Sequence, residues 1–208
     1  MEYIPLIGTA IVIHLLAMLS PGPNFIMAVR NSLTYSRKTG VFTAVGFGLG
    51  LIVHVFYCIA GLGIVIAKSI LLFNIIKFLG ATYLIYLGIQ SLCFKKSFVA
   101  LNDQKHQHDI SPLKAIRIGF LTNVLNPKST LFFLSLFTFV IGPEVPLNIQ
   151  LLICGIMVLN VMIWFSLVAV FFSQKRIQRV FFKFQKVFSR IFGGILVAIG
   201  LKIIFADN

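Results

Sequence analysis

The stretch Ser20-Pro21-Gly22-Pro23-Asn24 interrupts the first long apolar segment of this chain, and the stretch Asn126-Pro127-Lys128 interrupts the fourth. Proline removes a backbone hydrogen-bond donor, and its ring clashes with the preceding helical turn. Each interruption therefore predicts two half-helices that meet within a membrane, where the freed backbone groups need partners. Broken helices at corresponding places in two halves of a chain point to the binding site of a transporter.

Composition indicates a membrane protein. Of the 208 residues, 59% are hydrophobic and 11% are charged, so the chain is far more apolar than a soluble domain. Several apolar stretches approach or exceed the roughly 20 residues that span a bilayer. The N-terminus, Met1-Glu2-Tyr3-Ile4, has no basic region, so we interpret the first segment as a retained span rather than a signal peptide.

Six apolar segments are expected to cross the bilayer within one domain. They occupy residues 4–29, 41–67, 69–94, 115–141, 147–172 and 188–205 of the 1–208 chain. The longest loop, residues 95–114, separates half one (residues 1–94) from half two (residues 115–208). This loop holds His106 and His108, which fit a solvated loop better than a metal site.

Basic residues indicate the orientation of the segments. The formal net charge is +13, and most Lys and Arg residues lie in three alternating connections. They are Arg30, Arg37 and Lys38; then Lys95, Lys96, Lys105, Lys114 and Arg117; then Lys175, Arg176, Arg179, Lys183, Lys186 and Arg190. The opposite side has only Lys68, the nearby Lys77, and Lys202. The positive-inside rule places the three basic connections in the cytoplasm and both termini outside, which accounts for the charge without nucleic-acid binding.

Two halves of three spans must then have opposite orientations in the bilayer. The sequence therefore predicts an all-α polytopic membrane protein with six transmembrane helices, arranged as an inverted 3+3 repeat in which helices one and four are broken. An apolar stretch with glycine near each end occurs in the third segment (Gly80 and Gly88) and in the sixth (Gly193 and Gly200), which is a weaker sign of the same repeat.

The first break offers a candidate site for a carboxylate. Gly22 permits unusual backbone angles, and Ser20 and Asn24 add side-chain hydrogen bonding. Pro21 and Pro23 expose carbonyl groups, and a half-helix that starts near Pro23 directs N–H groups and the positive end of its dipole into the membrane. A kink that only shapes helix packing is the alternative, and the matching second break favours a functional role.

The second break adds a charge. Lys128 is the one charged side chain that lies well inside an apolar segment, and such a residue is a functional hypothesis by default. Its long stem could instead reach the interface. Lys128 could neutralise a substrate carboxylate or hold the opposing carbonyl groups. Asn123, Asn126 and Pro127 complete this side of the expected site.

Other polar residues narrow the chemistry. His14 and His54 lie in the first two segments, where an imidazole could carry a coupling proton or be a neutral, hydrogen-bonded core residue. No acidic residue lies within an expected span, which disfavours a cationic substrate and a carboxylate proton pathway. Cys58, Cys93 and Cys154 form no C-x-x-C pair, so neither a disulfide framework nor a metal or cofactor site is expected.

At these motifs the chain resembles the LysE/RhtB superfamily of bacterial amino-acid exporters. The matching stretches are residues 19–24, 46–54, 80–88 and 119–128, and their order and spacing agree over nearly the whole chain. The resemblance implies a six-helix protein of the inner membrane, driven by the proton motive force. Several members carry an aspartate directly after the glycine equivalent to Gly50, where this chain has Leu51. That difference favours the neutral homoserine/threonine branch over export of basic amino acids.

Together these features predict a secondary transporter, not an enzyme, that exports neutral amino acids or small derivatives by proton exchange. Its expected partners are an amino acid such as threonine, homoserine or leucine, protons and the lipid bilayer, and a homo-oligomer stays open. Three alternatives remain. A membrane thiol relay needs reactive cysteines near the breaks, an intramembrane enzyme needs clustered acids and bases, and a channel lacks saturable, proton-coupled flux.

Overall fold

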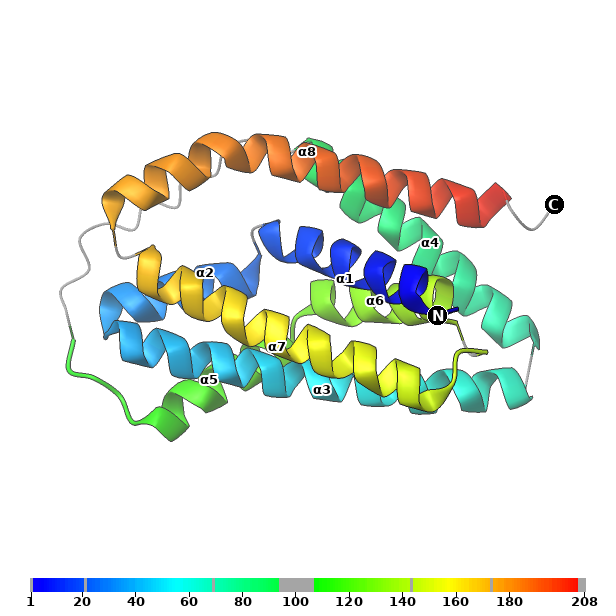
Figure 1. Ribbon diagram of the computed structural model, residues 1–208, viewed down its shortest axis with the longest axis horizontal. Helices are drawn as coiled ribbons and strands as arrows, with labels where there is room; N and C mark the ends of the chain where they lie inside the picture. Colours follow the sequence, from blue (N-terminus) through cyan, green and yellow to red (C-terminus); the bar gives the residue numbers. More distant parts are fainter. Residues whose placement is uncertain are drawn as a thin grey trace.

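The computed structural model describes residues 2–20, 22–68, 70–93, 107–142, 144–172 and 174–205. Within these residues every regular element is helical (Figure 1). The helices are α1 (Ile4–Leu19), α2 (Pro23–Thr34), α3 (Arg37–Lys68), α4 (Ile70–Leu92), α5 (Pro112–Val124), α6 (Pro127–Leu136), α7 (Leu147–Phe171) and α8 (Lys175–Phe205). A π-helical turn, η1 (Phe137–Ile141), extends α6 and ends at Gly142, whose φ of 71° suits glycine.

Both predicted breaks are present. Helix α1 ends at Leu19, α2 begins at Pro23, and the two helices meet at an angle of 55°. Helix α5 ends at Val124 and α6 begins at Pro127. In both cases proline occupies the first helical position, where its missing N–H costs no helical hydrogen bond. Pro21 lies outside the described residues.

Close helix contacts join the two halves. A Cβ atom on Gly46 of α3 would collide with the Ile116 carbonyl, and one on Gly119 of α5 would collide with the Thr43 carbonyl. Helices α4 and α8 approach similarly, since a Cβ on Gly88 would lie 2.7 Å from the Gly193 carbonyl oxygen. Small residues at such crossings let helix backbones touch. Figure 1 shows α4 and α8 along one side of the molecule and α3 with α7 along the other, with α1, α2 and α6 between them.

The core and the surface both fit a membrane protein. A buried cluster fills the space among α1, α2, α3, α6 and α7, and a smaller one joins α4 to α8. Large apolar side chains are also widely exposed on the outside; examples are Phe56, Leu71, Leu125, Leu159 and Ile163. Such an apolar surface suits lipid contact better than water. By length and composition, Arg37–Gly61 and α7 could each cross a bilayer alone, and α1 with α2 could do so as a bent pair.

A polar contact anchors the start of α3. The Asp109 carboxylate accepts hydrogen bonds from Thr39 Oγ1 at 2.5 Å and from Ser36 Oγ at 2.7 and 2.9 Å. These bonds, first that of Thr39 and then those of Ser36, lower the pKa of the Asp109 carboxyl below its ordinary value. The segment before α5 is thereby tied to the turn between α2 and α3.

Two helices begin before the apolar segments that they contain. The sixth apolar segment was placed at residues 188–205, and α8 begins at Lys175 and runs through the basic stretch. Lysine, arginine and glutamine are good helix formers, so charge alone does not end a helix. The fourth segment was placed from residue 115, and α5 begins at Pro112, where the Ser111 side chain accepts from Lys114 N. The stretch with His106 lies outside the described residues, whereas His108 is exposed.

Candidate functional site

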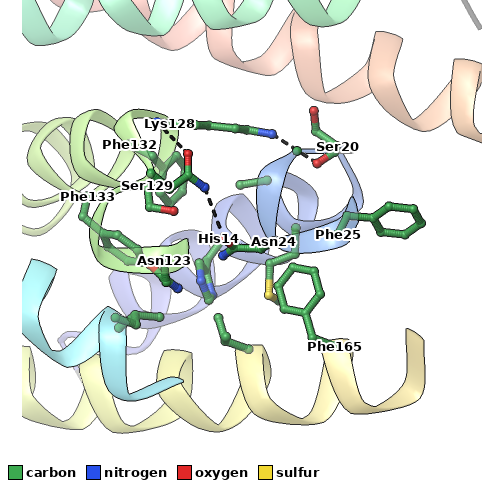
Figure 2. Close-up of a pocket in the computed structure, with 16 residues that line it drawn as sticks. His14, Ser20, Asn24, Phe25, Asn123, Lys128, Ser129, Phe132, Phe133 and Phe165 are labelled. Atoms are coloured by element: carbon green, nitrogen blue, oxygen red, sulfur yellow. Dashed lines mark hydrogen bonds between the residues drawn. The ribbon is translucent and has the colours of Figure 1, made fainter. Parts of the chain in front are cut away.

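The two breaks face one another and are joined by hydrogen bonds. Lys128 Nζ donates to the carbonyl oxygen of Ser20 at 3.1 Å. Asn126 Nδ2 donates to Asn24 Oδ1 at 3.4 Å. Figure 2 shows both contacts as dashed lines across the space between α2 and α6. Residues about a hundred positions apart in the sequence thus form one polar cluster, as the matched prolines predicted.

A cavity lies between the breaks. Its empty space, which includes the open mouth, is about 510 Å³. Its polar lining comes from His14, Ser20, Gly22, Asn24, Asn123, Asn126, Lys128 and Ser129. Its apolar lining comes from Ala17, Met18, Phe25, Leu51, Phe132, Phe133, Val161 and Phe165. The cavity therefore has a polar end at the breaks and an aromatic wall, an arrangement that suits a small zwitterion with an uncharged side chain.

Lys128 lies where two helix ends meet. Its ammonium group bonds to Ser20, the C-terminal cap residue of α1, so it neutralises the negative end of that helix dipole. Its stem runs beside Gly22, the N-terminal cap residue of α2, because a Cβ there would lie 3.5 Å from Lys128 Cδ. No side chain caps the N-terminus of α2. An anion beside Lys128 would therefore meet both an ammonium group and a positive helix end.

His54 does not line the cavity itself but holds a residue that does. Its Nε2 lies 2.9 Å from the Asn123 carbonyl oxygen and 3.0 Å from Asn123 Oδ1. Both partners are acceptors, since Asn123 Nδ2 donates to the Phe47 carbonyl, so Nε2 carries the proton. Nδ1 then accepts from the Tyr57 hydroxyl at 2.7 Å. His54 Nε2 thus holds Asn123 in place, while Nδ1 is occupied by Tyr57.

His14 has a different environment. Its side chain is 3% exposed and lines the cavity, and its ring centroid lies 5.7 Å from that of Phe133 and 6.2 Å from that of Phe132. Among the described residues, no group forms a hydrogen bond with its Nδ1. Figure 2 shows the ring among the residues that line the cavity. A buried polar atom without a partner is uncommon and calls for an explanation.

The structure brings most of the predicted site residues together. The cavity lining includes seven of them, namely Ser20, Gly22, Asn24, Asn123, Asn126, Lys128 and His14. Pro23 and Pro127 begin α2 and α6 and do not line the cavity themselves. His54 contacts the lining residue Asn123.

The aromatic wall was missed by the sequence analysis. Phe132 follows Lys128 by four positions, so it shares the Lys128 face of α6, and Phe133 is the next residue. The spacing of Phe132 was a usable signal. Phe25 and Phe165 gave no such signal, because phenylalanine in an apolar segment is equally expected to face lipid.

The cysteines do not form part of this site. Cys58 is buried, Cys93 is exposed, and Cys154 is half-buried, and none of them lines the cavity. The described residues also contain no group of three side chains suited to hold a metal ion. A thiol relay through the breaks therefore finds no support in this geometry.

Comparison with known proteins identifies the family. The family model described as LysE type translocator matches residues 15–207. The chain belongs to this family. It is 35% identical to the uncharacterized membrane protein YrhP of Bacillus subtilis over 97% of this chain and 96% of that protein. Translocators are transporters, which confirms the expectations of a membrane transport protein and of a non-enzymatic role.

Two further relatives of this LysE-type translocator have assigned activities. The chain is 28% identical to the threonine efflux protein of Salmonella typhi over 95% of this chain and 97% of that protein. It is 33% identical to the homoserine/homoserine lactone efflux protein of Salmonella typhimurium over 68% of this chain and 67% of that protein. No solved structure gives a significant match.

Proposed function

We propose that this LysE-type translocator exports a neutral amino acid or a small derivative across the inner membrane, in exchange for protons. The observation that carries the proposal is the cavity at the two breaks, which combines one ammonium group with an aromatic wall. The names of the threonine and homoserine efflux relatives support the same substrate class.

The proposed topology has six spans in an inverted repeat. The broken pair α1–α2, followed by α3 and α4, would correspond to the broken pair α5–α6, followed by α7 and α8. In support, both broken pairs have proline at the first position of their second helix. The positive-inside rule then places both termini outside. Rocking of one half against the other would expose the cavity to each side in turn.

Substrate binding is proposed to begin at Lys128. The substrate carboxylate would replace the Ser20 carbonyl as the partner of Nζ and would also lie near the uncapped N-terminus of α2. Ser20, Asn24, Asn123 and Asn126 form the remaining polar lining. A carboxylate is a stronger partner for an ammonium group than a peptide carbonyl, so the exchange favours binding.

A neutral side chain fits the other end of the cavity. No acidic residue lines it among the described residues, and Leu51 is fully buried in its wall. A lysine or arginine substrate would leave its second charge among phenylalanine rings without a counter-ion, which is costly. Threonine, homoserine and leucine avoid this cost.

Coupling to protons would supply the driving force. If one proton enters for each neutral substrate that leaves, one charge crosses the membrane field. That movement is worth roughly 2.3 kcal/mol per 100 mV, enough to sustain an outward gradient.

The proposal is tested with purified protein in liposomes under an imposed pH gradient. Uptake or release of radiolabelled threonine, homoserine and leucine should saturate and should depend on the gradient, whereas lysine and arginine should move slowly. Strong, selective lysine transport would overturn the substrate class. Flux that neither saturates nor responds to the gradient would indicate a channel instead.

A further inference from the structure

The hydrogen-bond acceptors of the cavity are unevenly occupied. The Ser20 carbonyl accepts from Lys128 Nζ, and Asn24 Oδ1 accepts from Asn126 Nδ2. Asn126 Oδ1 accepts from the Lys128 backbone N–H, and Asn123 Oδ1 accepts from His54 Nε2. Each of these oxygens already has a donor, and the ammonium group of a substrate would bring further N–H donors into the cavity.

His14 Nδ1 differs from these oxygens. Among the described residues of the cavity, it is the buried side-chain atom that has no hydrogen-bond partner. In the tautomer protonated at Nε2, Nδ1 presents a bare lone pair. Unlike an amide oxygen, an imidazole nitrogen can also take up and release a proton.

We propose that His14 is the residue on which the ammonium group of the substrate and the transported proton exclude one another. This inference rests on the proposed function and names the proton site within it. A neutral His14 accepts a hydrogen bond from the substrate ammonium group. A protonated His14 has lost its lone pair and repels that group, and the surrounding phenylalanines screen the repulsion poorly.

The groups around His14 determine its response to pH. Lys128 on α6 lines the same cavity and carries a positive charge. His54 on α3 stacks on the Phe133 ring, with 5.9 Å between the centroids, and is bonded to Tyr57. Tyr83 on α4 packs against the same buried cluster of α4 and α8 as Leu16 and Ala17 of α1, and Lys202 on α8 is exposed. The cavity residues on α2 and α7 carry no titratable side chain.

This arrangement gives an exchange cycle that balances. On the cytoplasmic side His14 releases its proton, and a zwitterionic amino acid binds with its carboxylate at Lys128 and its ammonium group at Nδ1. After the cavity opens outward, the amino acid leaves and a proton from outside binds Nδ1. One neutral substrate leaves the cell and one proton enters in each cycle.

The test compares two fluxes through the full-length protein in liposomes. One is threonine–threonine exchange without a gradient, and the other is threonine accumulation driven by a pH gradient. His14→Gln keeps an acceptor but cannot be protonated. Exchange should persist, while the ratio of gradient-driven to exchange flux should fall about tenfold or more, as expected for loss of an ordinary coupling free energy. A pH dye trapped inside the liposomes should report no proton movement while threonine moves through the variant.

Two controls separate His14 from the other histidines. His108→Gln, at an exposed position, should leave both fluxes unchanged. His54→Gln should lower both fluxes in the same proportion, because His54 only positions Asn123. If His14→Gln has the same ratio of gradient-driven to exchange flux as the wild-type protein, its transport is still coupled to protons. That result would overturn the inference but not the proposed function.

Two other results are decisive. If His14→Gln and His14→Asn are inserted but fail in exchange as well, the ring is needed for translocation itself, and the exclusion model is wrong. If the wild-type protein exchanges no neutral amino acid at all, the proposed function fails rather than the role of His14.

Discussion

The two breaks differ in how they satisfy their backbone groups. The second is closed by its own residues, because the Asn126 side chain accepts from Lys128 N and caps α6. The first is open, because Gly22 provides no side chain to cap α2. The second break also supplies a cation, whereas the first supplies the Ser20 carbonyl that this cation contacts. Two breaks that match in proline position thus differ, because one is the donor side and the other the acceptor side of these contacts.

This difference suggests that the two breaks have different roles in transport. Under the proposed function, the second break holds the charge in place, and the groups of the first break exchange partners when substrate binds. Substitutions at the second break should therefore affect both stability and transport. Substitutions at the first break should affect mainly transport.

Loss of the charge should have the largest effect. Lys128→Met removes the ammonium group from both Ser20 and the substrate carboxylate. We expect the ratio of maximal rate to KM for threonine export to fall about 100-fold, equivalent to about 3 kcal/mol. Lys128→Arg should retain part of the activity, since a planar fork replaces a compact ammonium group. Normal transport by Lys128→Met would show that the lysine only braces α1. Lys114→Met, at an exposed position, is the matched control.

Crowding the open break should have the next largest effect. Gly22 has an extended backbone, with φ of −154°, and a Cβ there makes ordinary contacts of 3.5 and 3.7 Å with Lys128. Gly22→Ala should therefore be tolerated. Gly22→Leu should occupy the space beside Nζ and raise KM about tenfold, equivalent to about 1.4 kcal/mol. Transport kinetics in liposomes measure both values, and an equal effect of both substitutions would argue against a substrate position beside Gly22.

Substitutions of Asn24 and Asn126 should differ in how much they affect stability relative to transport. Asn126→Ala removes the cap of α6 and the contact with Asn24, so it should lower the free energy of unfolding by about 1 kcal/mol and reduce export. Asn24→Ala removes only the contact between the breaks and should reduce export with a smaller change in melting temperature. Asn148→Ala, at an exposed position, is the control. Equal melting temperatures for the Asn24 and Asn126 variants would contradict the proposed difference between the breaks.

The smallest effect is expected away from both breaks. The pKa of Asp109 is lowered in the folded protein by Thr39 and Ser36, so its contribution to stability is present above its ordinary pKa of 3.8. It is lost as the pH falls from there through the lower, folded pKa. Asp109→Asn should thus lower the melting temperature slightly at neutral pH, and the difference from wild type should vanish in acid. Export should change little. An export defect as large as that of Asn24→Ala would mean that the breaks are not the only sensitive region.

The two helix breaks were easier to predict from the sequence than the ends of the helices. Proline and glycine act locally, so the breaks and the polar residues beside them could be read directly. Lys128 was recognisable because a charge inside an apolar segment is costly. The lack of a hydrogen-bond partner at His14 Nδ1 could not be predicted, since it depends on which side chains surround the ring in space. The contact between α3 and α5 likewise depends on how the halves pair.

The contact of Gly46 with Gly119 has a consequence for the evolution and engineering of exporters. Because each glycine lies against the backbone of the other helix, no larger residue fits there without separating α3 from α5. The aromatic wall, by contrast, contacts the cavity through side chains alone. Mutant libraries that seek a new cargo should therefore vary Phe132, Phe133 and Phe165 and leave the glycine crossing untouched.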